Sequence, residues 1–368
     1  MKENLTLTNR LASLDFLRGL TMVLLTLEST RLFEHLVPVT EGTWAARILN
    51  QFFHHPWHGI RFWDLVQPTF MFVAGVALAY SVKKQRLTTS WNATFIKVLK
   101  RCGWLFFWGV LDYAVRKTGL SFELWDVLTQ LSFTTLVAFL IMNWSVPAQL
   151  AVSGCCLLIP ELLYRYTHIP GFDQPFTDQH NFGNYVDLIL MNKINPGGWV
   201  AINCISTSAH TIWGALAGRL LMSDKVSSEK MKWLLMSSLI LLLCGFGLDW
   251  MNITPIIKRI ATSSFVLASG GYCVLFLAVC YWWVDIRKHR DHLMFFYLFA
   301  LNSIFIYLFF EIVGDRWFTG YILAITDGLF GIIQLPVLLS AVLGSLVVFA
   351  LEAGLLYFLY RKKIFFKL

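Results

Sequence analysis

The chain has 368 residues, of which 57% are hydrophobic and 14% are charged, and its formal net charge is +8. Soluble domains carry about 25% charged residues, so this composition excludes an ordinary soluble protein and indicates one that crosses a membrane many times. In such a protein a basic balance comes from cytoplasmic loops rich in Lys and Arg, and we therefore expect no nucleic-acid partner. The expected fold is all-α, a polytopic membrane helix bundle that forms a single domain over residues 1–368.

The first apolar run predicts a retained helix. It contains charged residues at several positions, and no small-residue cleavage site follows it, which argues against a removable signal peptide. The charged residues include Asp15, Arg18 and Glu28. The seven cysteines are scattered through apolar runs without a spacing that suits zinc, so no metal site is indicated.

Ten apolar runs reach about 20 residues, the length that crosses the hydrocarbon core of a bilayer. They cover residues 14–33, 62–82, 98–117, 124–142, 146–166, 199–222, 232–250, 262–284, 293–313 and 336–360. Alternate connections hold about twice as many Lys and Arg residues as the others, which predicts that both termini lie in the cytoplasm. The lipid bilayer is therefore the first expected partner.

Three of the connections expected on the outer side are long: 34–61, 167–198 and 314–335. The second is rich in Pro, Gly, Asn and Asp, a composition typical of turns. Loops on a rigid scaffold commonly hold binding residues, so we expect an acceptor molecule to bind at the outer face.

Four of the runs carry polar side chains at helical spacing. Such residues are costly in a bilayer, and charges of both signs on several helices favour a hydrated path through the bundle. The alternative is that they only hold helices together, as Gly214 does by letting another helix approach closely. The candidate residues of the path are Asp15, Arg18, Glu28, Trp57, Asn203, Thr207, His210, Lys258, Ser264, Asn302 and Glu311.

Residues 51–75 join a loop rich in His and Trp to the second apolar run. His54 lies ten residues before Asp64, and the chain between them can turn at Gly59. A carboxylate that holds one ring nitrogen of a His fixes its tautomer and raises the basicity of the other nitrogen, so such a pair can act as a general base or accept an acyl group. Pro68 cannot donate to the carbonyl of Asp64, which predicts an irregular first turn in this run.

Five blocks span nearly the whole chain: SLDFLRGLTM (13–22), HHPWHGIRFWDLVQPTFMFVAG (54–75), NPGGWVAINCISTSAHTIWGALAGRLL (195–221), KRIATSSFVLASGG (258–271) and ALNSIFIYLFFE (300–311). In this order they resemble the heparan-alpha-glucosaminide N-acetyltransferase family. The resemblance is greatest to the bacterial transmembrane acyltransferase members of that family, whose substrate is unassigned.

The resemblance implies that an acetyl group from cytoplasmic acetyl-CoA passes through the membrane to an amino sugar on the far side. In this family the active-site His lies three residues before a Trp and ten before an Asp. Here only His54 meets both spacings, with Trp57 and Asp64. The resemblance therefore implies His54 as acyl acceptor or general base and Asp64 as its partner, with an acetyl-His intermediate and direct transfer both open. His55 and His58 keep an interfacial interpretation.

Only about a dozen residues precede the first run, whereas the animal enzymes of the family carry a large N-terminal part outside the membrane. This difference favours an outward-facing amino sugar or glycan of a bacterial envelope as acceptor, with the protein in the inner membrane.

We therefore predict a membrane acyltransferase that uses acetyl-CoA as its acyl donor. Cations near the cytoplasmic side can bind the phosphates of CoA, although they also set topology; they are Arg18, Lys97, Lys100 and Arg101. The alternative is a transporter or flippase in which the polar side chains line a substrate path without covalent chemistry. The oligomeric state, a homodimer included, is open.

Overall fold

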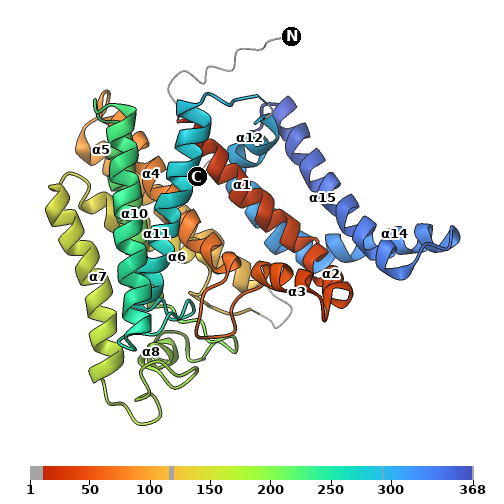
Figure 1. Cartoon of the computed structure of the whole chain (residues 1–368), viewed down its shortest axis with the longest axis horizontal. Coiled ribbons are helices and arrows are strands. Elements are labelled where there is room, and N and C mark those ends of the chain that lie inside the picture. Colours follow the sequence, from red (N-terminus) through yellow and green to blue (C-terminus); the bar gives the residue numbers. More distant parts are fainter. Residues whose placement is uncertain (1–10, 116–119, 292, 367–368) are drawn as a thin grey trace. The chain divides into compact units, whose positions relative to one another are not determined.

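The computed structural model describes residues 11–115, 120–291 and 293–366 (Figure 1). Within these residues every regular element is a helix, and the β-bridge between His58 and Ile257 is isolated. The prediction of an all-α chain is confirmed. The first ten residues and the last two, on which the predicted cytoplasmic termini depend, lie outside the described part.

Two compact units make up the chain. Unit 1 contains the residues up to Phe53 and those from Cys280 to Lys367, and unit 2 contains His54 to Val279. Each unit has fully buried aromatic side chains of its own, such as Phe299 in unit 1 and Phe139 in unit 2.

Unit 2 begins with a 3-10 turn that leads into a long helix, and seven further helices follow. These elements are η2 (Phe62–Leu65), α4 (Val66–Arg86), α5 (Trp91–Ala114), α6 (Val127–Leu140), α7 (Val146–Tyr166), α8 (Phe182–Met191), α9 (Asn203–Leu221), α10 (Ser227–Trp250) and α11 (Ser263–Cys280). The 3-10 turn is the irregular start predicted from Pro68.

Helices α4 and α9 of unit 2 pack backbone against backbone at two glycines. A Cβ atom on Gly75 would lie 2.0 Å from the carbonyl oxygen of Thr211, and one on Gly214 would lie 2.0 Å from that of Phe72. Only glycine fits at either position, so the predicted close approach at Gly214 is confirmed. This contact fixes α4, which follows Asp64, against α9.

Unit 1 consists of the N-terminal helices and the C-terminal quarter of the chain, with α1 lying alongside α12 (Figure 1). Its elements are α1 (Ala12–Ser29), α2 (Leu32–Thr40), α3 (Trp44–Leu49), η1 (Asn50–Phe52), η3 (Tyr281–Ile286), α12 (Met294–Leu301), α13 (Ser303–Phe309), η4 (Phe310–Phe318), α14 (Thr319–Ile332) and α15 (Val337–Arg361). Two of them, η3 and η4, have π-helical hydrogen bonding.

Each of the ten predicted apolar runs forms helix, and five of the described helices are long and apolar enough to cross a membrane. A sixth span results if Met294–Leu301 and Ser303–Ile332, which are bent by 73° at Asn302, are counted as one. The five are Phe62–Arg86, Val146–Tyr166, Ser227–Trp250, Ser263–Ile286 and Val337–Arg361.

The other four runs correspond to α1, α5, α6 and α9. Helix α1 carries three charges and α6 has only 14 residues, while α5 and α9 contain basic or polar side chains. The long predicted connections also hold helices that hydrophobic periodicity did not predict: α2 and α3, α8, and α14.

Candidate functional site

Asp64 is a fully buried carboxylate in η2, the 3-10 turn that leads into α4. Its Oδ2 accepts hydrogen bonds from the backbone N–H groups of Arg61 (2.9 Å) and His55 (3.2 Å), and its Oδ1 lies 3.0 Å from Nδ1 of His54. The 3-10 turn is closed by the N–H of Asp64 donating to the carbonyl of Arg61. Asp64 therefore ties the loop that precedes α4 to the helix and holds the His54 ring.

The expected contact between His54 and Asp64 is present. The His54 side chain keeps 40% of its surface exposed, and none of the hydrogen bonds within the described residues involves its Nε2 atom. Burial of the ring, followed by the charge of Lys258, lowers the pKa of His54 below its ordinary value, and the hydrogen bond to Asp64 opposes this shift. The neutral imidazole is thus favoured, with Nε2 directed away from the carboxylate that holds Nδ1.

Lys258 completes a three-residue cluster with His54 and Asp64. Its Nζ atom lies 3.0 Å from Nδ1 of His54 and 3.6 Å from Oδ1 of Asp64, and only 6% of the side chain is exposed. The ammonium also lies 5.2 Å from the ring centroid of Trp199, within the range of a cation–π contact.

The two neighbours of Nδ1 compete for it, since a neutral imidazole nitrogen either donates or accepts. When Nδ1 carries the hydrogen and donates to Asp64, Nε2 has a free lone pair and Lys258 pairs with the carboxylate. When Lys258 donates to Nδ1, Nε2 carries the hydrogen instead. The position of Lys258 therefore helps to decide whether Nε2 of His54 is a base.

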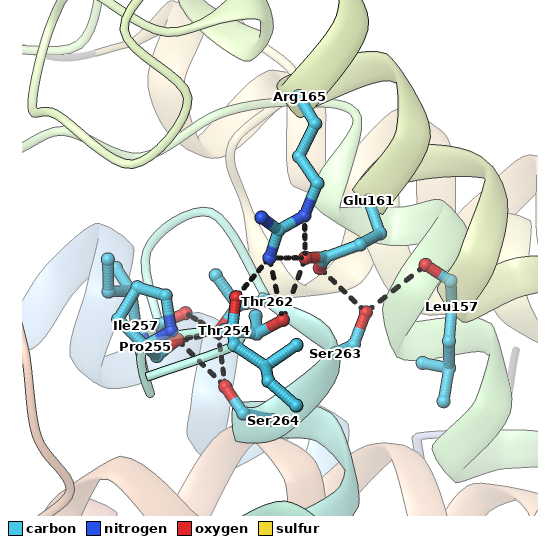
Figure 2. A network of polar contacts seen from close by, with 10 residues as sticks. Leu157, Glu161, Arg165, Thr254, Pro255, Ile257, Thr262, Ser263 and Ser264 are labelled. Atoms are coloured by element: carbon cyan, nitrogen blue, oxygen red, sulfur yellow. Dashed lines mark hydrogen bonds and ion pairs between the residues drawn. The ribbon is translucent and has the colours of Figure 1, made fainter. Parts of the chain in front are cut away.

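The loop that presents Lys258, residues 251–262, is fixed by a hydrogen-bonded network in unit 2 (Figure 2). Thr262 Oγ1 donates to the carbonyl of Pro255 (2.7 Å) and accepts from the N–H of Ile257 (3.0 Å). Ser264 Oγ also donates to Pro255 (2.7 Å). These bonds close the turn on both sides of Lys258.

The same network anchors the loop to α7 through Glu161 and Arg165 (Figure 2). Glu161 Oε1 accepts from Thr254 Oγ1 at 2.8 Å, and its Oε2 accepts from Ser263 Oγ at 2.9 Å. Arg165 pairs with Glu161 and also donates to the carbonyl of Ile253. Sequence analysis did not identify this network, because its members come from segments about 100 residues apart.

Aromatic side chains form part of the surroundings of His54. The ring centroid of Trp199 lies 5.8 Å from that of His54, with the rings nearly perpendicular. Trp57 donates from Nε1 to the carbonyl of Phe176 at 2.8 Å, which ties the His54 loop to residues 167–198. Gly198 has φ of +76°, and a Cβ there would lie 2.4 Å from Oδ1 of Asp178 and 2.8 Å from the Trp57 ring, so glycine is required at this position.

His55 and His58, for which we expect an interfacial position, each make a defined contact within the protein. The His55 ring packs on Gly59, where a Cβ atom would lie 2.6 Å from Nε2. His58 Nε2 lies 2.7 Å from Oδ1 of Asp249 at the end of α10, and the same oxygen accepts from the N–H of Ile256. This second His–Asp pair connects the His54 loop with the Lys258 loop, and sequence analysis missed it because 191 positions separate its members.

Other candidate residues in unit 2 take part in packing. Thr207 Oγ1 donates to the carbonyl of Asn203, one turn earlier, and His210 Nε2 lies 2.9 Å from Ser269 Oγ on α11. Asn203 Nδ2 donates to the carbonyl of Arg259, beside Lys258. Of the predicted path residues, the structure therefore groups Trp57, Lys258 and Asn203 near the His54 loop, whereas Thr207 and His210 lie along α9.

The remaining candidates belong to unit 1. Arg18 Nη2 and Asp15 Oδ1 form the predicted pair at 3.0 Å. Asn302, at the bend between α12 and α13, donates to the carbonyl of Ile364 and accepts from the N–H of Phe366. Glu28 and Glu311 line one polar cavity of about 370 Å³.

A further buried acid, Asp187 on α8, was not among the sequence candidates. Its Oδ2 accepts from Trp125 Nε1 (3.0 Å) and its Oδ1 accepts from the N–H of Ala201 (2.9 Å). Burial raises the pKa of Asp187 to about 7, although both hydrogen bonds oppose the shift. Ala201 lies two residues after Trp199. Asp187 thus fixes the segment that follows Trp199.

Comparison with known proteins gives a family but no activity. The model of the family described as "Domain of unknown function (DUF5009)" matches residues 10–213, more than half of the chain. No curated protein matches the chain. The matched region includes His54, Asp64 and Trp199, and it ends before Lys258. The chain therefore belongs to the DUF5009 family.

Proposed function

We propose that this protein is a membrane acyltransferase in which His54, held by Asp64, transfers an acetyl group from acetyl-CoA to an amino sugar or glycan. The observation that carries the proposal is the position of Nδ1 of His54, 3.0 Å from the carboxylate of Asp64, in a side chain that keeps 40% of its surface exposed. The resemblance of the chain to the heparan-alpha-glucosaminide N-acetyltransferase family supports the same chemistry.

In the direct route, the amino nitrogen of the acceptor bonds to the acetyl carbon while Nε2 of His54 takes a proton from that amino group. The carbon–sulfur bond of the thioester breaks, and the CoA thiolate leaves and takes up a proton. In the covalent route, Nε2 itself bonds to the acetyl carbon as the carbon–sulfur bond breaks and the CoA thiolate leaves. The acceptor amine then bonds to the acetyl carbon, the bond from that carbon to Nε2 breaks, and Nε2 takes up the proton that the amine loses. Both routes need Nδ1–H to face Asp64, so that the developing positive charge on the ring is stabilised.

Lys258 has two roles in this proposal. Its ammonium keeps His54 neutral at neutral pH, because a second positive charge beside the ring is unfavourable. Its pairing with Asp64 helps to balance the charge of a buried carboxylate. The cations that we propose to bind the phosphates of CoA lie on α5, in a different part of unit 2. They are Lys97, Lys100 and Arg101.

The topology belongs to the proposal as well. Ten spans with both termini in the cytoplasm of a bacterial inner membrane would bring acetyl-CoA from the inside and the acceptor from the outside. The polar, aromatic surroundings of His54 suit a sugar, whose hydroxyl groups bond to polar side chains and whose apolar face stacks on Trp rings.

The test is acetyl transfer by purified protein in lipid vesicles, with acetyl-CoA and glucosamine as substrates. Release of the CoA thiol and formation of the acetylated sugar, followed by mass spectrometry, should both depend on the protein. His54→Ala should abolish transfer, whereas His168→Ala, a matched change at an exposed His of the 167–198 segment, should retain it. Undiminished transfer by His54→Ala would remove His54 from the mechanism.

The rival function is a transporter or flippase without covalent chemistry, and it predicts that the protein does not bind acetyl-CoA. It requires no acetyl-CoA site, so acetyl-CoA should leave the melting temperature unchanged. A rise in melting temperature with acetyl-CoA, but not with free acetate, favours the acyltransferase.

A further inference from the structure

Glu352 is a buried acid in unit 1 that the proposed acetyl transfer does not use. It lies in α15, the most apolar of the candidate membrane spans, and its relative exposure is 0%. The residues one turn before and after it on the same face, Val348 and Leu356, are equally buried. Glu352 therefore occupies the interior of a packed helical unit.

Both carboxylate oxygens of Glu352 lack a hydrogen-bond partner among the residues that the structure describes. This distinguishes it from the other buried acids of the fold, such as Asp64 and Asp187, which each accept several hydrogen bonds. An ionised carboxylate without donors or a cation is strongly disfavoured in such surroundings, whereas the neutral acid is tolerated.

The neighbouring backbone leaves room for this side chain. Gly314, in the π-helical segment η4, faces Glu352, since a Cβ atom built on Gly314 would lie 3.5 Å from Oε1. The same Cβ position lies 3.2 Å from Cβ of Phe310. Segments of π-helix within α-helices often occur at functional sites, and this one brings a glycine opposite the acid.

Phe310 connects these surroundings with a polar space. It lines the cavity of about 370 Å³ in unit 1 together with Glu28, Ser29, Arg31, Glu34 and Glu311. Phe310, which lines this cavity, and Gly314, which faces Glu352, are therefore four residues apart in the same segment, η4.

The helices packed against α15 carry other titratable groups, but no described contact joins any of them to Glu352. His35 instead contacts Ser345 Oγ at 3.0 Å, and Asp327 accepts from Ser340 Oγ at 2.7 Å. The charged and titratable groups on the elements around α15 are Asp15, Arg18, Glu28, Glu34, His35, Tyr297, Glu311, Arg316, Tyr321 and Asp327.

We propose that Glu352 is a proton-binding carboxyl inside the membrane part of this protein, protonated in the folded state and reactive toward apolar carboxyl reagents. Protonated acids at such positions are the elements of proton relays and of proton-coupled carriers. The inference is independent of acetyl transfer, because it concerns unit 1 alone.

Dicyclohexylcarbodiimide tests the proposal, since it enters bilayers and reacts with protonated carboxyls. The acid proton adds to one carbodiimide nitrogen and the carboxyl oxygen bonds to the central carbon; the acyl group then shifts to nitrogen, so the product keeps the whole mass of the reagent. Full-length protein in lipid vesicles at about pH 6, where exposed acids are ionised, should give this adduct at Glu352 in peptide mass spectra. Glu352→Gln should lose it.

A water-soluble carbodiimide with an added amine provides the matched measurement. It should label exposed acids such as Glu41 and leave Glu352 unmodified. Labelling of Glu352 by dicyclohexylcarbodiimide should also decline as the pH is raised, because the reactive form is the acid. Absence of the apolar adduct across this pH series, or labelling of Glu352 by the soluble reagent as readily as Glu41, overturns the proposal.

Discussion

The ammonium nitrogen of Lys258 lies 3.0 Å from Nδ1 of His54, although 204 positions separate the two residues. Asp64 contacts the same ring nitrogen from within the His54 loop. His54 therefore has two oppositely charged neighbours at one ring nitrogen, one local in sequence and one distant.

Lys258→Met should raise the pKa of His54, because the Lys258 charge lowers it in the folded protein. If neutral His54 is the active form, the acid limb of the pH–rate profile for acetyl transfer should move to higher pH. Diethyl pyrocarbonate, which reacts with neutral imidazole, gives a measure that does not need activity: the pH midpoint for modification of His54 should also rise. Lys193→Met, which removes the partner of Glu123, is the control, and equal midpoints in the two variants would exclude this role of Lys258.

Asp64→Asn should reduce acetyl transfer by about 10²- to 10⁴-fold, the usual size of a general-base contribution. The amide oxygen can still accept from both backbone N–H groups that bind Oδ2 of Asp64, so the fold should be retained. It cannot supply the negative charge that stabilises protonated His54. The measurement is kcat at saturating acetyl-CoA, with Asp173→Asn, at an exposed Asp of the 167–198 segment, as control. Retention of full activity in Asp64→Asn would show that the pair has only a structural role.

Asp187 should make the folded protein less stable as the pH rises. Burial raises its pKa from 3.8 to about 7, so between these values the folded state holds a proton that the unfolded state has lost. Stability from this group is therefore complete at low pH and falls until the pH passes 7. The full loss is about 4 kcal/mol, of which about 2 kcal/mol falls between pH 5.5 and 8.

Asp187→Asn should remove most of this pH dependence, because the amide stays neutral. The difference in melting temperature between about pH 5.5 and pH 8 should be smaller in the variant than in the unchanged protein. Asn cannot accept from Trp125 through its NH₂ group, so the variant should also lose about 1 kcal/mol at every pH. An equal pH dependence in both proteins would contradict the assignment.

Glu161→Gln should loosen the loop that presents Lys258. The change removes the charge that pairs with Arg165 and weakens acceptance from Thr254 and Ser263. Hydrogen exchange at residues 253–262 should become faster by about tenfold, which corresponds to the loss of about one charged hydrogen bond. Glu229→Gln removes an exposed partner of Lys225 on α10 and should leave the loop unchanged. Equal exchange in the two variants would show that the network does not hold the loop.

Sequence patterns predicted the helical architecture well, because the length of an apolar run and the spacing of its apolar residues reflect which side chains avoid water. The run predicted at 146–166 coincides with α7, and the irregular turn predicted from Pro68 is the 3-10 turn at Phe62–Leu65. Short helices such as α8 and α14 were not predicted, since their length and composition are within the range of ordinary connections. We expected ten spans. Among the described residues, five helices are long and apolar enough to cross a membrane, or six if the bent pair is counted as one span.

The sequence by itself determined an all-helical chain with long apolar helices. It also allowed a contact between His54 and Asp64, because the ten-residue spacing with a turn at Gly59 can bring them together, and the family resemblance singled out His54. Tertiary structure decided the rest. It brought Lys258 to the same ring nitrogen and paired His58 with Asp249. It also left the buried carboxyl of Glu352 in unit 1 without a hydrogen-bond partner among the described residues. These contacts depend on how distant helices pack and on how loops close, and neither hydropathy nor spacing within one segment carries that information.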